Sequence, residues 1–164
     1  MSAYRLAILA LVLPLIWGAA GAQTGSQPDT LPRFASLSSD KVFLRQGPGY
    51  DYRILWVYHR KGLPVLVTAQ YDVWRKVRFS DGTAGWVHVA MLSSHRTVLV
   101  TGRSDAPVRA GSAPQASVIA LAAPGVIAQL RRCKAEACDV SVAGLEGWIN
   151  RNQIWGVSRA PDGS

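Results

Sequence analysis

The sequence predicts an all-β protein made of two small antiparallel β-barrels that follow one another along the chain. Three observations lead to this prediction: short apolar segments alternate with turn signals, no segment keeps a helical periodicity over three turns, and the pattern of the first half recurs in the second. The 164 residues include 15 glycines and 9 prolines, which argue against a long coiled coil or helical repeat. With 49% hydrophobic and 17% charged residues, the composition is that of a globular protein.

The first 22 residues are expected to be a secretory signal peptide. Arg5 supplies a positive charge, Leu6 to Trp17 is an apolar run, and Ala20 to Ala22 offers small residues for cleavage after Ala22. An uncleaved anchor is the alternative, but the run of 12 residues is shorter than the roughly 20 that cross a bilayer. We therefore expect a periplasmic or secreted protein that starts with a flexible leader, residues 23–33, and has no integral membrane span in its mature chain.

The charge of the chain favours an anionic partner. Its formal net charge is +8, and removal of the signal peptide would take away one arginine and no acidic residue. Peptidoglycan, phospholipid head groups and lipopolysaccharide are anionic surfaces that an exported protein meets. Export and the dispersed cations argue against nucleic acid, since only Arg60-Lys61, Arg75-Lys76 and Arg131-Arg132 are adjacent.

Short β-rich segments fill the chain from residue 36 onward. The expected strands are Val42 to Leu44, Ile54 to Tyr58, Leu63 to Gln70, Val73 to Phe79, Ala84 to Met91 and Thr97 to Val100. Gly47-Pro48-Gly49 ends the first strand, and Ser80-Asp81-Gly82 marks a hairpin turn. In the fourth strand, Val73, Arg75, Val77 and Phe79 alternate with Trp74, Lys76 and Arg78, which is typical of a half-buried strand. Five or six strands in about sixty residues favour a small antiparallel barrel.

The pattern then recurs after 62 to 64 residues. A G-x-x-G-W turn at Gly82 to Trp86 is answered by the same motif at Gly144 to Trp148. The other aligned pairs are Arg45 and Arg109, Ile54 and Val118, Gly62 and Gly125, Trp74 and Cys138, and Leu92 and Ile154. This regular spacing indicates a tandem repeat of one β module. The short link from Ser94 to Thr97 predicts little independent motion between the copies.

The motifs of the first copy resemble those of bacterial SH3-like domains. These motifs are V-F-L-R-Q-G-P-G at Val42 to Gly49, a Trp-x-x-Val pair at Trp74 and Val77, and D-G-x-x-G-W-V ending at Val87. The second copy resembles the family less closely, because Gly111-Ser-Ala-Pro114 stands where the first copy has Gly-Pro-Gly and Cys138 replaces the tryptophan.

This resemblance implies both a fold and a role. It implies an SH3-like barrel of five or six strands at residues 34–94 and a divergent one at residues 97–158. It also implies a non-catalytic module that binds cell-wall peptidoglycan or peptides in the envelope. Lytic members of the family usually carry their activity in a separate domain, and we expect no such domain in this sequence.

Cys133 and Cys138 are expected to form a disulfide, because an even cysteine count in an exported protein implies pairing. A zinc site is the rival interpretation, but the two thiols lack a second Cys/His pair. Facing residues of a hairpin lie about 4.5–5.5 Å apart at Cα, which a disulfide can bridge. The bond is predicted to fix one turn, a structural and not a catalytic role.

No constellation of residues predicts catalysis or a cofactor. The only histidines are His59, His88 and His95, and the serines lack a G-x-S-x-G motif. Distant histidines can converge in a fold, so a metal site stays open although none is predicted. Oxidised cysteines remove a Cys-His nucleophile pair. We therefore expect no enzyme, and a hydrolase is the least favoured alternative.

The aromatic residues carry the binding prediction, with core packing as the alternative for each of them. Trp86 and Trp148 repeat at one position and are assigned to packing. The predicted ligand-binding residues are Tyr50, Tyr52, Trp56, Tyr58 and Trp74, with Arg45, Arg53 and Asp51 as polar neighbours. The second copy lacks the loop tyrosines, so we expect the first to bind and the second to have a structural or docking role.

Two ligand classes remain compatible with this surface. Peptidoglycan or its stem peptides are preferred, because the basic charge and the resemblance agree on them. The alternative is an adaptor that binds an extended or proline-rich segment of an envelope protein. Acidic stem peptides require nearby cations and extended peptides require aromatic surfaces; both occur near Tyr50, and the sequence does not decide between them.

Overall fold

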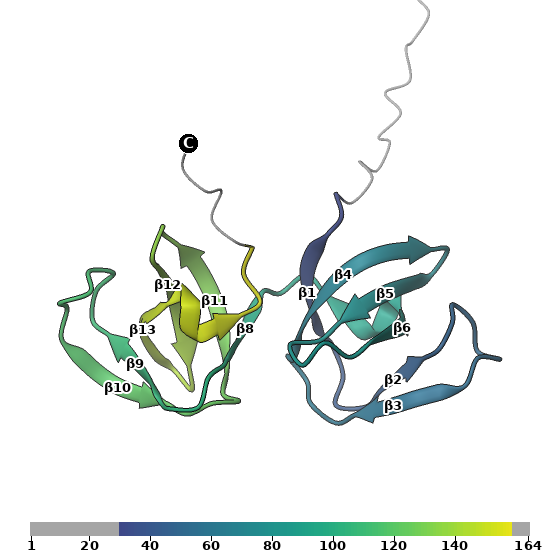
Figure 1. Cartoon of the computed structure of the whole chain (residues 1–164), viewed down its shortest axis with the longest axis horizontal. Coiled ribbons are helices and arrows are strands. Elements are labelled where there is room, and N and C mark those ends of the chain that lie inside the picture. Colours follow the sequence, from purple (N-terminus) through teal and green to yellow (C-terminus); the bar gives the residue numbers. More distant parts are fainter. Residues whose placement is uncertain (1–29, 159–164) are drawn as a thin grey trace, which may run out of the picture.

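The protein consists of two antiparallel β-sheets joined by a short link (Figure 1). A computed structural model describes residues 30–158, so the expected signal peptide, residues 1–22, lies outside the described residues. Two 3-10 turns, η1 (Val89–Met91) and η2 (Arg151–Gln153), are the only helices in this part of the chain. No helix among these residues is long and apolar enough to span a membrane. The all-β prediction is confirmed.

Seven strands form each sheet. The first sheet holds β1 (Arg33–Leu37), β2 (Val42–Arg45), β3 (Ile54–Tyr58), β4 (Pro64–Tyr71), β5 (Trp74–Arg78), β6 (Ala84–His88) and β7 (Leu92–Ser93). The second holds β8 (Thr97–Val100), β9 (Ala106–Arg109), β10 (Val118–Ala122), β11 (Ile127–Cys133), β12 (Ala137–Val142), β13 (Leu145–Asn150) and β14 (Ile154–Trp155). The six predicted strands agree with β2 to β6 and β8 to within a residue or two, except that η1 replaces the end of the strand expected over Ala84 to Met91. The strands β1 and β7 were not predicted, and β1 begins at Arg33, the last residue of the expected flexible leader.

The two sheets have the same topology, which confirms the tandem repeat. The strand order is β3-β2-β6-β5-β4-β1-β7 in the first and β10-β9-β13-β12-β11-β8-β14 in the second. The prediction of closed barrels is wrong, because no ladder among the described residues joins the two edge strands of either sheet. The β2–β3 hairpin is attached to β6 through one residue pair, Arg45 with Trp86. The second repeat uses one equivalent pair, Arg109 with Trp148, so each hairpin splays away from its sheet (Figure 1).

The repeated G-x-x-G-W motif makes this single attachment possible. Its first glycine lies in a turn at positive φ, +88° at Gly82 and +86° at Gly144. Its second glycine lies where two strands approach closely: a Cβ atom at Gly85 would come within 2.7 Å of the Arg45 carbonyl oxygen. At Gly147 it would come within 2.5 Å of a Val108 methyl carbon. Each glycine of the motif therefore has its own steric reason.

One strand of the second sheet is shared between two hydrophobic cores. All four residues of β8 are buried. Val98 and Val100 pack in the second core, whereas Leu99 on the opposite face packs in the first. Ile127 of the neighbouring strand β11 also packs against the first core. A strand that is buried on both faces is expected to be apolar on both. Here the core of the second repeat covers one face of β8, and the core of the first repeat covers the other.

Polar contacts reinforce this interface. The Ser36 and Thr97 hydroxyl oxygens lie 2.6 Å apart, and the Thr97 hydroxyl lies 2.6 Å from the Gly62 carbonyl oxygen, to which it can donate. The rings of Phe34 and Trp155 meet edge to face with centroids 5.1 Å apart. The two repeats thus contact one another through core packing, hydrogen bonds and an aromatic pair.

The disulfide prediction is confirmed. Cys133 and Cys138 are direct cross-strand partners at the ends of β11 and β12, with Cα atoms 4.0 Å apart. The Lys134 amide donates to the Ala137 carbonyl and closes the same turn. The bond therefore fixes a tight hairpin turn.

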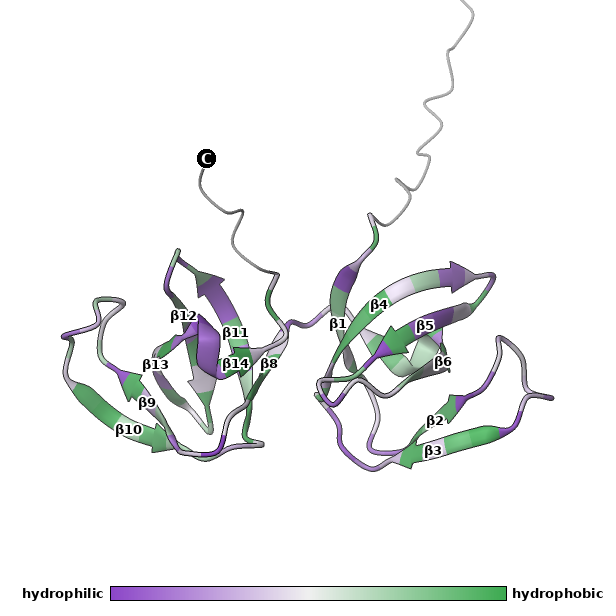
Figure 2. Cartoon of the chain, viewed as in Figure 1, coloured by the Kyte–Doolittle hydropathy of each residue, from purple (hydrophilic) through white to green (hydrophobic). Residues whose placement is uncertain are grey.

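Each sheet ends in an exposed apolar edge strand. Trp56 of β3 is 62% exposed, and Leu121 of β10 is 65% exposed. Figure 2 shows hydrophobic residues along most of both strands. Because β3 and β10 occupy equivalent places in the strand order, the exposed edge is a property of the repeat and not of one copy.

The shared strand predicts that a change in the second repeat destabilises the first. We expect Leu99→Ala to leave a cavity in the first core and to lower its unfolding free energy by about 2–5 kcal/mol. Native-state hydrogen exchange should show the loss of protection first in β1 and β4. Val100→Ala is the control, because this side chain packs in the second core. Loss of protection confined to the second repeat in Leu99→Ala would contradict the shared core.

Candidate functional site

The outer face of the first sheet carries a compact group of side chains around Tyr50, called here the Tyr50 cluster: Arg45, Tyr50, Trp74 and His88. The Tyr50 ring meets Trp74 edge to face at 5.1 Å between centroids and stacks on His88 at 6.1 Å. Trp74 and His88 are cross-strand partners on β5 and β6, so they point to the same face. Trp74 is 6% exposed, whereas Tyr50 is 69% exposed. Tyr50 thus presents an open ring on a buried support.

Arg45 holds the loop that carries Tyr50. Its guanidinium donates hydrogen bonds of 2.8 Å to the carbonyl oxygens of both Tyr50 and Tyr52, and it lies 5.5 Å from the Tyr50 ring centroid. The Tyr52 ring packs on Gly47, where a Cβ atom would come within 2.4 Å of the ring. The Gly-Pro-Gly motif therefore makes room for Tyr52, and two hydrogen bonds from Arg45 fix the loop in place.

The structure separates Trp56 and Tyr58 from the Tyr50 cluster. Both side chains belong to β3, where Trp56 pairs with the buried Leu44 and Tyr58 with the buried Val42. They therefore lie on the core side of the sheet, opposite Trp74, and the predicted aromatic residues do not form a single wall. Among the described residues, no ring contact joins either side chain to the Tyr50 cluster.

Tyr58 is a packing residue, and Trp56 is an exposed edge residue. The Tyr58 ring stacks on Phe79 with centroids 4.0 Å apart and packs against the first core. Burial raises the pKa of the Tyr58 hydroxyl; the Asp81 carboxylate adds to the rise and a hydrogen bond with Thr83 opposes it. Asp51 and Arg53 are exposed in the loop beside Tyr50 and Tyr52. The sequence prediction missed His88, and its position two residues after Trp86, on the same strand face, was the available signal.

The second repeat has a different set of residues at the equivalent place. Arg109 corresponds to Arg45, because its guanidinium donates a 2.8 Å hydrogen bond to the loop carbonyl of Ala116. In the register of β12 and β13, Ala137 pairs with Asn150 as Trp74 pairs with His88. Ala137, and not Cys138, therefore occupies the position of the tryptophan.

These replacements leave an open groove in the second repeat. A cavity of about 550 Å³ is bounded by Arg109, Pro114, Ala137, Trp148 and Asn150 among others. A second cavity of about 600 Å³ adjoins it and shares Asn150 with it, along with Thr101, Glu136 and Asn152. In the first repeat, large aromatic side chains occupy the equivalent positions, and in the second repeat this space is empty.

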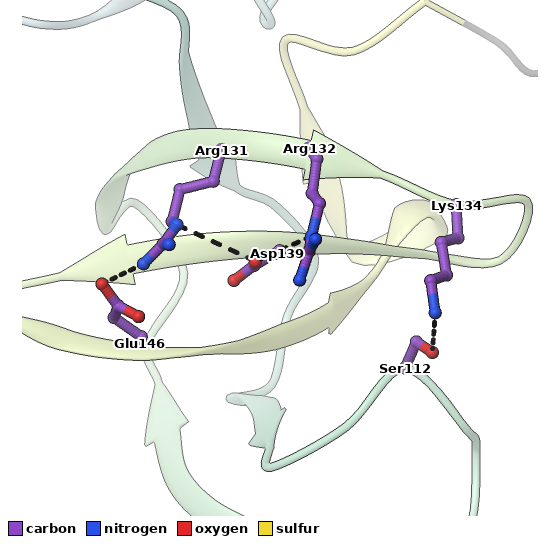
Figure 3. A network of polar contacts seen from close by, with 6 residues as sticks. All are labelled: Ser112, Arg131, Arg132, Lys134, Asp139 and Glu146. Atoms are coloured by element: carbon purple, nitrogen blue, oxygen red, sulfur yellow. Dashed lines mark hydrogen bonds and ion pairs between the residues drawn. The ribbon is translucent and has the colours of Figure 1, made fainter.

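Cations surround one wall of this groove. Lys134 and Arg132 lie 5.1 and 5.5 Å from the ring centroid of Trp148. The Lys134 ammonium also donates a 3.1 Å hydrogen bond to the hydroxyl of Ser112, a residue that lines the groove (Figure 3). The buried Asp139 carboxylate forms ion pairs with both arginines: its Oδ2 atom lies 3.2 Å from Nε of Arg132 and 3.8 Å from Nε of Arg131. Arg131 also pairs with Glu146. Trp148 is 9% exposed, so it forms a supporting floor and not an open stacking surface, in agreement with its assignment to packing.

The histidines of the described part do not converge. His88 belongs to the Tyr50 cluster, and His95 lies at a cavity between the repeats. Within residues 30–158, no three histidine, cysteine, aspartate or glutamate side chains gather in a group that could hold a metal ion.

Comparison with known proteins gives one family match. The sequence matches the bacterial SH3 domain family over residues 38–94 and again over residues 103–156, which together are more than half of the chain. No curated protein sequence matches the chain.

Solved structures offer more distant similarities. The chain resembles NlpC2 and NlpC1 from Trichomonas vaginalis, each at 11% identity and a TM-score of 0.37, and covers 51% of either protein. The match includes 81% of this chain for NlpC2 and 85% for NlpC1. It also resembles a NlpC/P60 family protein from Bacillus cereus at 13% identity and a TM-score of 0.33, with 77% of this chain and 57% of that one covered. The chain thus spans little more than half the length of these structures.

The contacts of Arg45 predict a loop that loses order when the guanidinium is removed. We expect Arg45→Ala to lower the free energy of local opening of residues 46–53 by about 2 kcal/mol, because two hydrogen bonds to loop carbonyls are lost. Hydrogen exchange at the Gln46 and Tyr52 amides, both bonded within the loop, measures this opening. Arg53→Ala is the matched control. Equal exchange in the two variants would show that Arg45 does not hold the loop.

Proposed function

Because the chain belongs to the bacterial SH3 domain family, we propose that it is an exported, non-catalytic binding module that recognises peptidoglycan or its stem peptides through the loop surface of the first repeat. Bacterial SH3 domains are binding modules typical of exported proteins, and residues 1–22 have the pattern of a signal peptide. The observation that carries the proposal is the Tyr50 ring, which is 69% exposed and yet supported by Trp74, His88 and Arg45.

An exposed ring on a rigid support is suited to binding. A surface tyrosine that is mobile loses rotamer freedom when a ligand covers it, and this loss weakens the complex. Contacts with Trp74 and His88 restrict Tyr50 before a ligand arrives, and the Arg45 hydrogen bonds restrict its backbone. The open ring face then remains available to the apolar face of a sugar or to a peptide.

The charges of the same loop fit an acidic ligand. Arg53 is exposed beside Tyr52, and Lys41 lies over the Phe43 ring on the strand before the loop. The Arg45 guanidinium is bound to loop carbonyls, so we assign it a positioning role and leave recognition of stem-peptide carboxylates to Arg53. Asp51 and Tyr52 complete the exposed loop surface, whereas Trp56 is exposed separately, on the other face of the sheet at the β3 edge.

The proposal predicts a specific effect of two aromatic residues on cell-wall binding. In co-sedimentation of the chain from Gln23 to Ser164 with purified peptidoglycan sacculi, Tyr50→Ala should weaken retention about tenfold, and Trp56→Ala should weaken it less, since its ring lies on the other face of the sheet. Leu121→Ala, an exposed apolar residue of the second repeat, is the control.

A salt series separates this binding from general attraction to an anionic polymer. Retention should persist at moderate ionic strength if the Tyr50 surface recognises the wall. Retention that disappears with salt and is equal in all variants would instead reflect the net charge of the chain, and it would refute the proposed surface.

A second candidate function is supported by the groove of the second repeat. Two adjoining cavities of about 550 and 600 Å³ share four lining residues, so together they offer a continuous surface to an extended peptide. Asn152 and Gln153 line it, and within residues 30–158 their side-chain amides have no hydrogen-bond partner. An adaptor role for an extended or proline-rich segment of an envelope protein would use this groove.

The adaptor function predicts that restoring the tryptophan of the first repeat closes the groove. Ala137→Trp places a large side chain at the position equivalent to Trp74, so binding of extended peptides should fall by about tenfold or more. Titration of a panel of proline-containing and proline-free peptides against tryptophan fluorescence measures it. Tyr50→Ala should leave this binding unchanged, whereas peptide binding that persists in Ala137→Trp and is lost in Tyr50→Ala would assign it to the first repeat.

A further inference from the structure

A third cavity opens between the two repeats. Its volume is about 710 Å³, larger than either cavity of the second-repeat groove. Residues of the first repeat line one side, among them Leu37 and Lys61, and residues of the second repeat line the other, among them Gln129 and Ser141. The contacts of Ser36, Thr97 and Leu99 described above join these two sides, so the cavity is part of a packed interface.

A row of polar side chains crosses this cavity. Gln129 of β11 is the direct cross-strand partner of both Thr97 on β8 and Ser141 on β12. Three residues aligned in this way point to the same face of the sheet. Ser36 of the first repeat extends the row through its 2.6 Å contact with Thr97. The row across the interface therefore consists of the hydroxyls of Ser36 and Thr97, the side-chain amide of Gln129 and the hydroxyl of Ser141.

The members of this row differ in their hydrogen bonding. Thr97 and Ser36 contact each other and the carbonyl oxygens of Gly62 and His95, so they serve the interface itself. Within the described residues, the Gln129 amide and the Ser141 hydroxyl have no hydrogen-bond partner of their own. They offer two donors and an acceptor from Gln129, and one donor and an acceptor from Ser141, toward the cavity.

An apolar side chain and a cation complete the lining. Ile127 is only partly buried against the first core and presents hydrocarbon to the cavity, whereas Leu37 is 1% exposed and lies beneath the surface. The Lys61 ammonium has no ion-pair or hydrogen-bond partner within residues 30–158, and it lies at the same cavity. A sugar ring combines an apolar face with a rim of hydroxyl groups, and an acidic sugar adds a carboxylate.

We propose that the cavity between the repeats binds a saccharide, with ring hydroxyls hydrogen-bonded by Gln129 and Ser141, the apolar ring face on Ile127, and the carboxylate of an acidic sugar toward Lys61. This site is separate from the Tyr50 surface and does not rest on the function proposed for it. It requires both repeats, because neither one supplies the complete lining.

The test is a titration of the full chain from Gln23 with N-acetylmuramic acid, which carries a carboxylate, and with neutral N-acetylglucosamine. Amide chemical shifts should change at Gln129, Ser141 and Thr97. Gln129→Leu should weaken binding about fivefold, the loss of one or two hydrogen bonds. Lys61→Gln should reduce the affinity for N-acetylmuramic acid to that for the neutral sugar.

Two matched controls keep the result specific. Gln70→Leu removes an exposed glutamine from β4, the strand equivalent to β11, and should leave both affinities unchanged. Tyr50→Ala should leave the shift changes at Gln129, Ser141 and Thr97 unchanged, even where it weakens retention on sacculi. Shift changes confined to residues around Tyr50, equal affinity in wild type and Gln129→Leu, or no shift change at all would each overturn the proposed cavity site, whatever the outcome with sacculi.

Discussion

The packing of β8 between two hydrophobic cores is the constraint on which the rest of the structure depends. Leu99 completes the first core from a strand of the second sheet, while Val98 and Val100 on the other face serve the second. A rigid junction follows, because separating the repeats would expose Leu99 and Ile127 to water. The cavity between the repeats exists as a defined space only because this junction holds its two sides together.

The repeats share a scaffold and differ in the surface that it carries. In both, an arginine before the loop bonds to loop carbonyls, and a glycine allows one strand to pass close to another. At equivalent positions on the outer face, however, the first repeat has Trp74 and His88 where the second has Ala137 and Asn150. One repeat therefore presents an exposed ring on a filled surface, and the other presents a groove. Duplication of a stable module has left its outer face free to diverge, because the core residues lie on the opposite face of each strand.

Most of the fold could be predicted from the sequence, and less of the site. Strand positions follow from alternation and turn residues, and the repeat follows from the two G-x-x-G-W motifs. Alternation within a strand, however, does not reveal which face of β3 meets which face of β5; only the pairing of Trp56 with Leu44 does so. The correspondence of Trp74 with Ala137 was also hidden. The offset between the copies falls from 64 to 62 residues along the repeat, because the turns differ in length by single residues. Only the strand pairing shows where these differences lie. The open sheets could not be predicted either: the first hairpin is attached to its sheet through one residue pair, Arg45 with Trp86, and alternation within a strand does not fix how many pairs two strands form.

The exposed apolar edge strands leave two different surfaces open to strand pairing between molecules. β3 and β10 end the two sheets at opposite sides of the protein (Figure 1), and each leaves backbone groups without a partner strand. Charged or proline residues that would block further pairing are missing from Ile54 to Tyr58 and from Val118 to Ala122. Because β3 and β10 differ in side chains, joining one to the other would be head-to-tail, and such contacts extend into filaments unless the geometry closes a ring. The positive net charge of the chain, +8 for the full sequence, opposes such pairing between molecules by mutual repulsion.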